Sequence, residues 1–189
     1  TFGLLVSVLF LPFSVSAAQK TVTAYGNAQL DTAQKKFATA SGLFDGTGDY
    51  LDIPDNADWE FGSGDFTVES FVRFAVTTGA QVLYGSYVTP VPGRRWIVYF
   101  NANNLQFAYS TTGANGTDTS FAWTPSANTW YHVAVSRSGN TLKAFVDGTQ
   151  IGSNLDMTGV TIFDTNSVMY VGQEGSNSFS ISFCSTINL

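Results

Sequence analysis

Oxygen-bearing side chains are concentrated in one short stretch of this 189-residue chain. Within fourteen residues lie Asp45, Asp49, Asp52, Asp55, Asn56 and Asp58. Calcium takes six to eight hard oxygen ligands, and carboxylates, amides and backbone carbonyls supply them. Aspartates also populate turns, because their side chains bond to nearby backbone N–H groups. The sequence therefore predicts a structural calcium ion held by Asp45, Asp49 and Asp52, with turn-forming aspartates as the alternative.

Two pairs of carboxylates could act as an acid and a base in catalysis. Such a reaction needs two carboxyl groups flanking the bond that is broken, one protonated and one charged. Asp58 with Glu60 and Asp65 with Glu69 have spacings that fit such a pair. The first pair falls in a Gly-rich loop and the second at the start of an expected strand, where surface carboxylates are common. The sequence has no Ser-His-Asp set, phosphate loop or Cys/His cluster, so catalysis is only the alternative.

Aromatic side chains next to amides are the third kind of candidate. A sugar needs an exposed aromatic face with amides or hydroxyls beside it. Such neighbourhoods involve Trp59, Tyr87, Trp96, Tyr109 and Trp123, with Asn101, Asn103, Asn104 and Asn115. The ligand-binding candidates among them are Trp96, Asn103, Tyr109 and Trp123. We expect most of these large rings to lie in the core.

Charge and composition argue against a nucleic-acid partner. Only 12% of the residues are charged, and the net charge is −6 with eight Lys and Arg. A nucleic-acid-binding protein needs a basic surface to neutralise phosphates, so we expect no nucleic-acid partner. The charge instead favours cations or neutral ligands. The single cysteine, Cys184, has no intramolecular disulfide partner.

The first residues have the pattern of a secretory signal. An apolar run covers residues 3–13, and Val15-Ser-Ala17 offers small residues where a signal peptidase cuts. We interpret residues 1–17 as part of a signal peptide that the sequence enters at Thr1. Residues 18–40 are interpreted as a lead-in linker, with a strand around residues 21–25 as the alternative. A buried strand or helix is the alternative. The prediction is a protein secreted or held at the cell surface, with no transmembrane segment in the mature chain.

The rest of the sequence alternates with the period of β-strands. Phe66, Val68, Ser70, Val72 and Phe74 share one face of the longest run. The segment 130–148 predicts a β-hairpin with a turn at 138–141 and a second reversal at Asp147-Gly148. Shorter strands are expected at residues 42–46, 49–53, 81–84, 96–100, 105–109, 121–123, 149–151, 160–163 and 169–171. This regular spacing favours an all-β sandwich with negligible helix.

Five motifs in this order resemble the laminin-G-like family of the concanavalin A-like lectin/glucanase superfamily. They lie at residues 44–51, 64–71, 130–137, 146–148 and 170–172, and the resemblance covers residues 41–175. It implies a jelly-roll β-sandwich of two antiparallel sheets. Relatives often hold one structural calcium, and the family's glucanases carry a compact acidic triplet that this sequence lacks. Physics explains most of the motifs without a ligand, because glycines allow tight turns and large rings fill the space between sheets.

The end of the chain departs from this pattern. Members of the family usually continue into a last strand with an acidic pair and an arginine. Residues 176–189 instead alternate Phe179, Ile181 and Phe183 without any acidic residue, which indicates an atypical tail or a substitute for the last strand. The resemblance implies a binding or adhesion module for a glycan or an extracellular protein. The alternatives are a glycoside hydrolase and a purely structural domain of a larger surface or virion protein.

Overall fold

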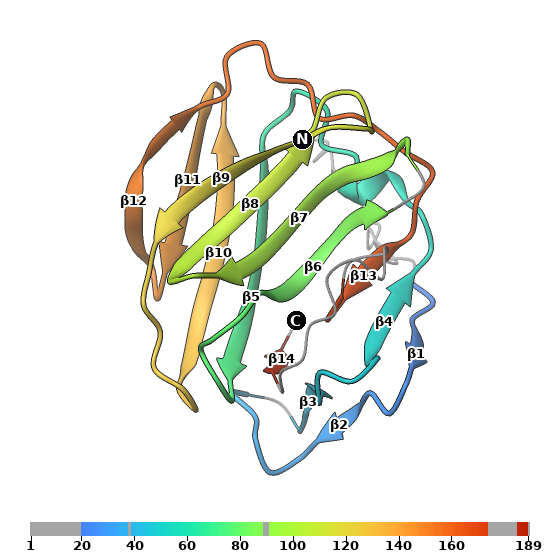
Figure 1. Cartoon of the computed structure of the whole chain (residues 1–189), viewed down its shortest axis with the longest axis vertical. Helices are drawn as coiled ribbons and strands as arrows, with labels where there is room; N and C mark the ends of the chain where they lie inside the picture. The colour runs from blue at the N-terminus through green and yellow to red at the C-terminus, as the bar shows by residue number, and fades with distance from the viewer. Residues whose placement is uncertain (1–19, 38, 89–90, 174–184, 189) are drawn as a thin grey trace, which may run out of the picture.

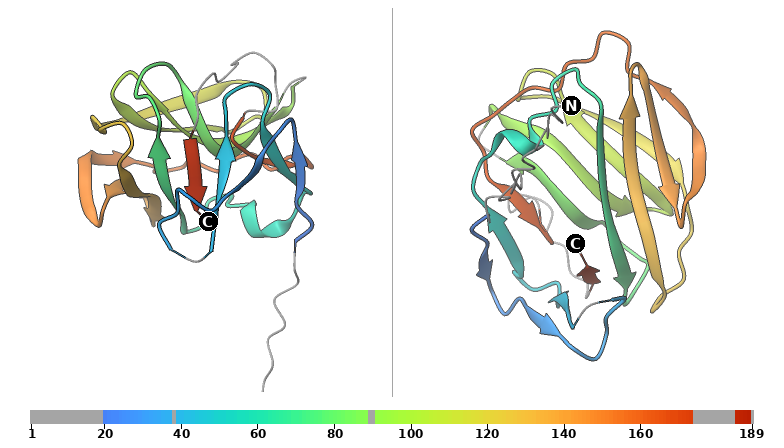
Figure 2. Two further views of the ribbon diagram at one scale, coloured as in Figure 1. Left: turned by 90° about the horizontal axis from the view of Figure 1, so that it is seen from below. Right: turned by 180° about the vertical axis from the view of Figure 1, so that it is seen from behind.

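The computed structural model describes residues 20–37, 39–88, 91–173 and 185–188. Within them the chain forms a sandwich of two seven-stranded sheets, in which every pair of neighbouring strands is antiparallel (Figure 1). Figure 2 shows the two layers from the edge and from behind. The only helical segment in the described part is a single 3-10 turn, η1 (Ala57–Trp59). The predicted all-β jelly-roll sandwich is confirmed.

Sheet A brings together strands from the two ends and the middle of the chain. Its order is β1 (Thr23–Tyr25), β4 (Tyr50–Ile53), β13 (Met169–Val171), β6 (Gln81–Val88), β7 (Gly93–Asn101), β8 (Asn104–Ser110) and β9 (Gly116–Ala122). Strands β6 to β9 follow one another in sequence and form a meander, which is the broad part of the sheet in Figure 1.

Sheet B is built around the longest alternating segment of the sequence. Its order is β12 (Thr149–Asp156), β11 (Thr141–Val146), β10 (Trp130–Ser138), β5 (Phe66–Phe74), β14 (Ser185–Asn188), β3 (Ser41–Phe44) and β2 (Gln29–Asp31). Strands β5 and β10 pair along eight residues, from Phe66 opposite Arg137 to Arg73 opposite Trp130. The expected hairpin is present with a tighter turn, because Ser138 already pairs with Thr141.

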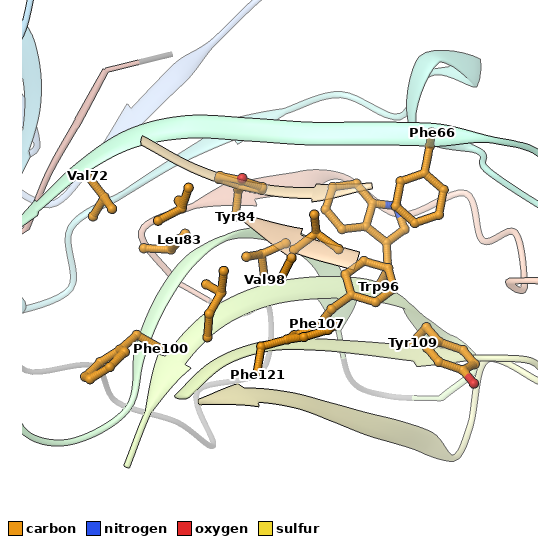
Figure 3. Packing of buried hydrophobic residues seen from close by; sticks show 14 of the residues in the cluster. Phe66, Val72, Leu83, Tyr84, Trp96, Val98, Phe100, Phe107, Tyr109 and Phe121 are labelled. Carbon is orange, nitrogen blue, oxygen red and sulfur yellow. The ribbon is translucent and has the colours of Figure 1, made fainter. Parts of the chain in front are cut away.

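Large apolar side chains from both sheets fill the space between them (Figure 3). Phe74, Phe100, Phe107 and Phe121 are fully buried, and burying one such ring is worth about 1.5–3 kcal/mol. The Trp96 indole lies in the same cluster and donates its N–H to the Trp59 carbonyl at 3.0 Å. This packed interior leaves only the outer faces and the loops of the sandwich for ligands.

Three features of the chain differ from the sequence prediction. The lead-in at residues 18–40 contributes β1 and β2, which pair with β4 and β3, so the sandwich begins before residue 41. These two short strands are almost wholly exposed, so no hydrophobic alternation marked them. Residues 160–163 form no strand, although Ile162 is buried. There the buried backbone N–H of Ile162 bonds to the Gly62 carbonyl, in a loop rather than in a sheet.

The tail contributes one strand to the described part of the chain, at residues 185–188. Strand β14 lies between β3 and β5 and pairs with both, so it closes sheet B next to one of its first strands. The alternating residues Phe179, Ile181 and Phe183 and the signal-like segment 1–17 lie outside the described residues. In the described part, no helix is long and apolar enough to cross a membrane.

Candidate binding site

The outer face of sheet A is hollowed into a groove of about 420 Å³ over strands β6 to β9. Its lining is formed by Ala80, Val82, Tyr87, Arg94, Ile97, Tyr99, Asn101, Gln106, Ala108 and Asp118. Val82, Ile97 and Ala108 are buried and form an apolar floor, with Tyr87 and Tyr99 packed against it. The groove therefore combines a dry base with half-buried aromatic walls.

The alternation of each strand places these side chains outside the core. Along β7, Trp96, Val98 and Phe100 point inward, so Ile97 and Tyr99 between them must face outward. The register continues the same layer into β8, where Ala108 lies opposite Ile97 and Gln106 opposite Tyr99. Because β7 buries residues on both faces, its sequence shows an apolar run rather than a clean alternation.

Polar contacts hold the two tyrosine rings in place. The Tyr99 hydroxyl donates to Asp118 Oδ1 at 3.1 Å. The Arg94 guanidinium lies 5.0 Å above the centre of the Tyr87 ring and donates to the Ala114 carbonyl at 2.9 Å. Gly116 lets Tyr87 keep this position, because a Cβ there would lie 1.7 Å from the Tyr87 hydroxyl oxygen and would force the ring to move. The groove walls are thus fixed by contacts with β9 and with the loop between β8 and β9.

The chemistry of this groove suits a polar ligand with an apolar face. The tyrosine rings and the floor offer surface for packing, while Asn101 and Gln106 bring amide donors and acceptors. Asp118 is the only carboxylate among the lining residues, and glycoside hydrolysis uses two. The groove can bind and orient a ligand, but its described lining has no pair of carboxyl groups across a scissile bond.

The predicted ligand contacts are not brought together. Trp96 and Tyr109 are 1% and 7% exposed and point into the core, where no sugar can stack on them, so these two predictions are wrong. Trp123 is half-buried against Phe74, which leaves it at the edge of the core. Asn103 is exposed in the turn between β7 and β8 with a positive φ of 61°. The expectation that most of the rings lie in the core is confirmed.

Several groove residues were missed or not selected from the sequence. Tyr99, Gln106 and Asp118 carry no motif, and Tyr87 and Asn101 were weighed without being chosen. The signal that finds them is their position between inward-facing core residues on β7 and β8. Using this signal requires knowing that both faces of β7 are partly buried, and this cannot be recognised from the sequence alone.

The carboxylates of residues 45–58 separate into four locations. Asp49 is 4% exposed, and its two oxygens accept the backbone N–H groups of Asn27 and Asp45 at 2.8 Å each. Asp45 accepts from the Asn27 side chain at 3.0 Å and from the Thr47 N–H at 2.7 Å, and these bonds, the Asn27 one first, lower the pKa of Asp45. These two aspartates therefore stabilise the turn between β3 and β4 and tie β1 to it.

The remaining aspartates of this stretch have other neighbours. Asp52 lies on β4 beside Tyr25, whose pKa its charge raises. Asp55 pairs with Arg95 at 2.9 Å, and Asp58 forms an ion pair with Lys20. Over residues 20–37, 39–88, 91–173 and 185–188, no group of three or more His, Cys, Asp or Glu side chains could hold a metal ion. Calcium binding by Asp45, Asp49 and Asp52 stays a prediction, and the structure joins only the first two.

The two pairs considered for hydrolysis also lie away from the groove. Asp65 accepts the Gly139 N–H at 2.6 Å, beside the turn of the long hairpin. Glu69 lies on sheet B, with a carboxylate oxygen 3.1 Å from His132 Nε2. His132, the only histidine of the sequence, is thus a half-buried residue with a hydrogen-bonding partner.

Comparison with known protein families assigns the chain to one of them. A profile described as the concanavalin A-like lectin/glucanases superfamily, of the laminin-G type, matches residues 45–183. The chain belongs to this superfamily. No curated protein matched the sequence. The match confirms the resemblance carried by the five sequence motifs, and it extends from the turn after β3 into the tail.

The solved structures of similar fold include binding domains of Paraclostridial Mosquitocidal Protein 1 and of botulinum neurotoxins. The binding domain of Paraclostridial Mosquitocidal Protein 1 superposes with a TM-score of 0.72 at 13% identity, covering 92% of this chain and 44% of that one. The ligand binding domain of botulinum neurotoxin serotype D, solved with N-acetylneuraminic acid, gives 0.68 at 12% identity, covering 92% and 42%. This superfamily member thus spans less than half of each toxin domain, and the likeness concerns its fold.

Proposed function

We propose that this protein is a non-catalytic binding module that acts outside the cell and recognises a glycan or an extracellular protein through the groove on sheet A. The observation that carries the proposal is the groove itself. Its half-buried tyrosines, apolar floor and adjacent amides match the way polar ligands with apolar faces are bound. A neutral or weakly charged ligand fits best, because Arg94 and Asp118 lie on the same lining with opposite charges.

The structural neighbours support a binding role without naming the ligand. They are described as binding domains of toxins, and one of them was solved with N-acetylneuraminic acid. Because one fold hosts many functions, this likeness alone does not assign a ligand to the present chain. The location outside the cell rests on the signal-like first residues of the sequence.

Two alternatives differ from this proposal in testable ways. A glycoside hydrolase of the glucanase type would turn over β-glucans, and a Glu69→Gln variant would lose that turnover. A purely structural domain of a larger surface or virion protein would show no saturable ligand. The single carboxylate in the groove favours binding over hydrolysis.

The decisive experiment is a glycan array followed by titration of the strongest ligand. We expect saturable binding that weakens roughly tenfold in Tyr99→Ala, which corresponds to about 1.4 kcal/mol, because an aromatic contact is worth up to this much. Phe145→Ala is the matched control, since it removes a half-buried ring from sheet B instead. Equal losses in both variants, or no saturable binding to any glycan or extracellular protein, would contradict the proposal.

A further inference from the structure

A second group of side chains lies on sheet A, away from the groove. It consists of Tyr25 on β1, Tyr50 and Asp52 on β4, and Tyr170 on β13, and we call it the tyrosine cluster. Tyr50 and Asp52 alternate with Leu51 and Ile53, which pack against the core. The tyrosine cluster therefore lies on the outer face of the sheet.

Strand register sets the geometry of the three rings. Tyr25 lies directly opposite Tyr50, and their rings are stacked with centres 4.6 Å apart and an interplanar angle of 8°. Tyr170 lies opposite Asp52, and its ring meets that of Tyr50 at 67° with centres 5.7 Å apart. Tyr25 is 41% exposed, and the other three residues are half-buried. Aromatic surface and one carboxylate thus converge where solvent still reaches them.

The electrostatics of the tyrosine cluster favour positive charge. The charge of Asp52 is the largest cause that raises the pKa of Tyr25. Burial, followed by Tyr50 and Asp52, raises the pKa of Tyr170. Both phenols therefore stay neutral at physiological pH, and their electron-rich faces lie beside a negative charge. Ring faces of this kind attract cations, most strongly cations that shed water easily.

No ion pair is seen at Asp52 among the described residues. Lys20, Arg95 and His132 pair with other carboxylates. Lys36 lies over the ring of Phe71, on sheet B. The net charge of −6 further favours a cationic ligand over an anionic one.

We propose that the tyrosine cluster is a binding site for a methylated ammonium ion. Because Tyr25 and Tyr50 cover each other's facing sides, the ammonium group lies against an outer side of this stacked pair or against Tyr170. The Asp52 carboxylate neutralises its charge. Methyl groups make such a cation larger and less tightly hydrated than a simple ammonium, so the rings contact it at a lower desolvation cost.

This site is separate from the groove and does not rest on the proposed function. Tyr170 lies opposite Gly85, and Gly85 lies opposite Ile97 of the groove floor. Tyr170 and Ile97 are therefore two strand spacings, about 10 Å, apart. The groove residues on β6 lie one strand spacing from β13, and the two sites have no residue in common.

The test is a titration of the full chain with tetramethylammonium chloride, followed by two-dimensional NMR against a sodium chloride reference. We expect saturable shifts in the millimolar range at Tyr25, Tyr50 and Tyr170. The neutral molecule tert-butanol has a similar shape without the charge and should shift these residues far more weakly. Asp52→Asn should weaken tetramethylammonium binding roughly two- to fivefold, the weight of an exposed ion pair.

Ring and control variants separate this site from unspecific effects. Tyr25→Leu should weaken tetramethylammonium binding about two- to fivefold relative to the parent protein. Tyr25→Phe keeps the aromatic face and should bind nearly as well as the parent. Asp118→Asn is the control, because it removes a carboxylate that contacts Tyr99 on the same sheet. This variant should leave the affinity for tetramethylammonium unchanged. Equal shifts with tert-butanol, or unchanged affinity in Asp52→Asn, would overturn the proposal. Asp52→Asn is nearly isosteric, so the proposal stays testable even if Tyr25→Leu fails to fold.

Discussion

Asp52 and Asp55 are three residues apart in sequence and serve opposite purposes. Asp55 joins Asp164 in an ion pair with Arg95, whose side chain is fully buried on β7. Asp52 belongs to the tyrosine cluster and forms no ion pair within the described residues. The difference lies in the partner. A buried guanidinium must be neutralised within the protein, whereas a half-buried carboxylate that solvent still reaches can be neutralised by a ligand.

The Arg95 group therefore belongs to the scaffold. Arg95 occupies a bulge of β7, between the pairs that Arg94 and Trp96 make with β6, and it links the loops that carry Asp55 and Asp164. One guanidinium nitrogen makes both contacts, at 2.9 and 2.7 Å. Changes in this group should alter stability, and changes in the tyrosine cluster should alter binding.

The largest effect is expected when Arg95 loses both carboxylates. In a variant with Asp55→Asn and Asp164→Asn, the buried charge is left without compensation, so stability should fall by about 3–5 kcal/mol in urea unfolding. Adding Arg95→Met removes that charge and should recover much of the loss. Tetramethylammonium binding by the folded protein should stay unchanged. A double variant as stable as the parent would show that the ion pairs contribute nothing.

Asp49 provides a second test of the scaffold role of aspartates. Asp49→Ala leaves the N–H groups of Asn27 and Asp45 without their acceptor, so we expect a loss of about 2–3 kcal/mol. Asp45→Ala is the matched control, because Asp45 is exposed and its removal should cost clearly less. Urea unfolding of both variants measures the difference. A larger loss in Asp45→Ala would contradict the assignment of Asp49 as the main tie between β1 and this turn.

The turn that carries Asp45 and Asp49 would also be a ligand site if it bound calcium. We propose that Asp45 and Asp49, with nearby carbonyls, bind calcium weakly, near millimolar concentrations. The melting temperature should then rise with calcium and fall with a chelator. At a calcium concentration ten times the dissociation constant, the free energy of unfolding should increase by about 1.4 kcal/mol. Asp45→Asn should remove most of this gain. Identical melting with calcium and with chelator would show that the turn is held by hydrogen bonds alone.

The sequence predicted the scaffold better than the sites, and the residues show why. The period of Phe66 to Phe74 predicted β5 with its bounds, because one face of that strand packs against the core and the other is polar. β2 was missed, and β1 was reached only through the alternative of a strand around residues 21–25, since neither strand buries an alternating set of side chains. Short edge strands are held by pairing, which local sequence does not report.

The sites depend on which distant strands become neighbours. Tyr25, Tyr50 and Tyr170 come from three separate segments, and only the order β1-β4-β13 brings them together. Trp96 and Tyr109 have the residue types of a sugar platform, but strand register points them inward. The residue types therefore indicate which chemistry is possible. The strand order and register determine which side chains are placed to perform it.

The smallest predicted effect is a difference in pH dependence between the turn and the tyrosine cluster. The pKa of Asp45 lies below 3.8, so folding favours its charged form, and its contribution to stability is present above that value and lost as the pH falls through the folded pKa. The pKa of Tyr25 lies above 10.0, so its contribution is present below pH 10 and lost as the pH rises further.

Melting curves over the acid and the alkaline pH ranges measure both contributions. Asp45→Asn should flatten the acid limb and leave the alkaline limb unchanged, whereas Tyr25→Phe should flatten only the alkaline limb. Because both groups are exposed, each change should be small. If either variant altered the opposite limb, the turn and the tyrosine cluster would be coupled rather than independent, and the division between them would fail.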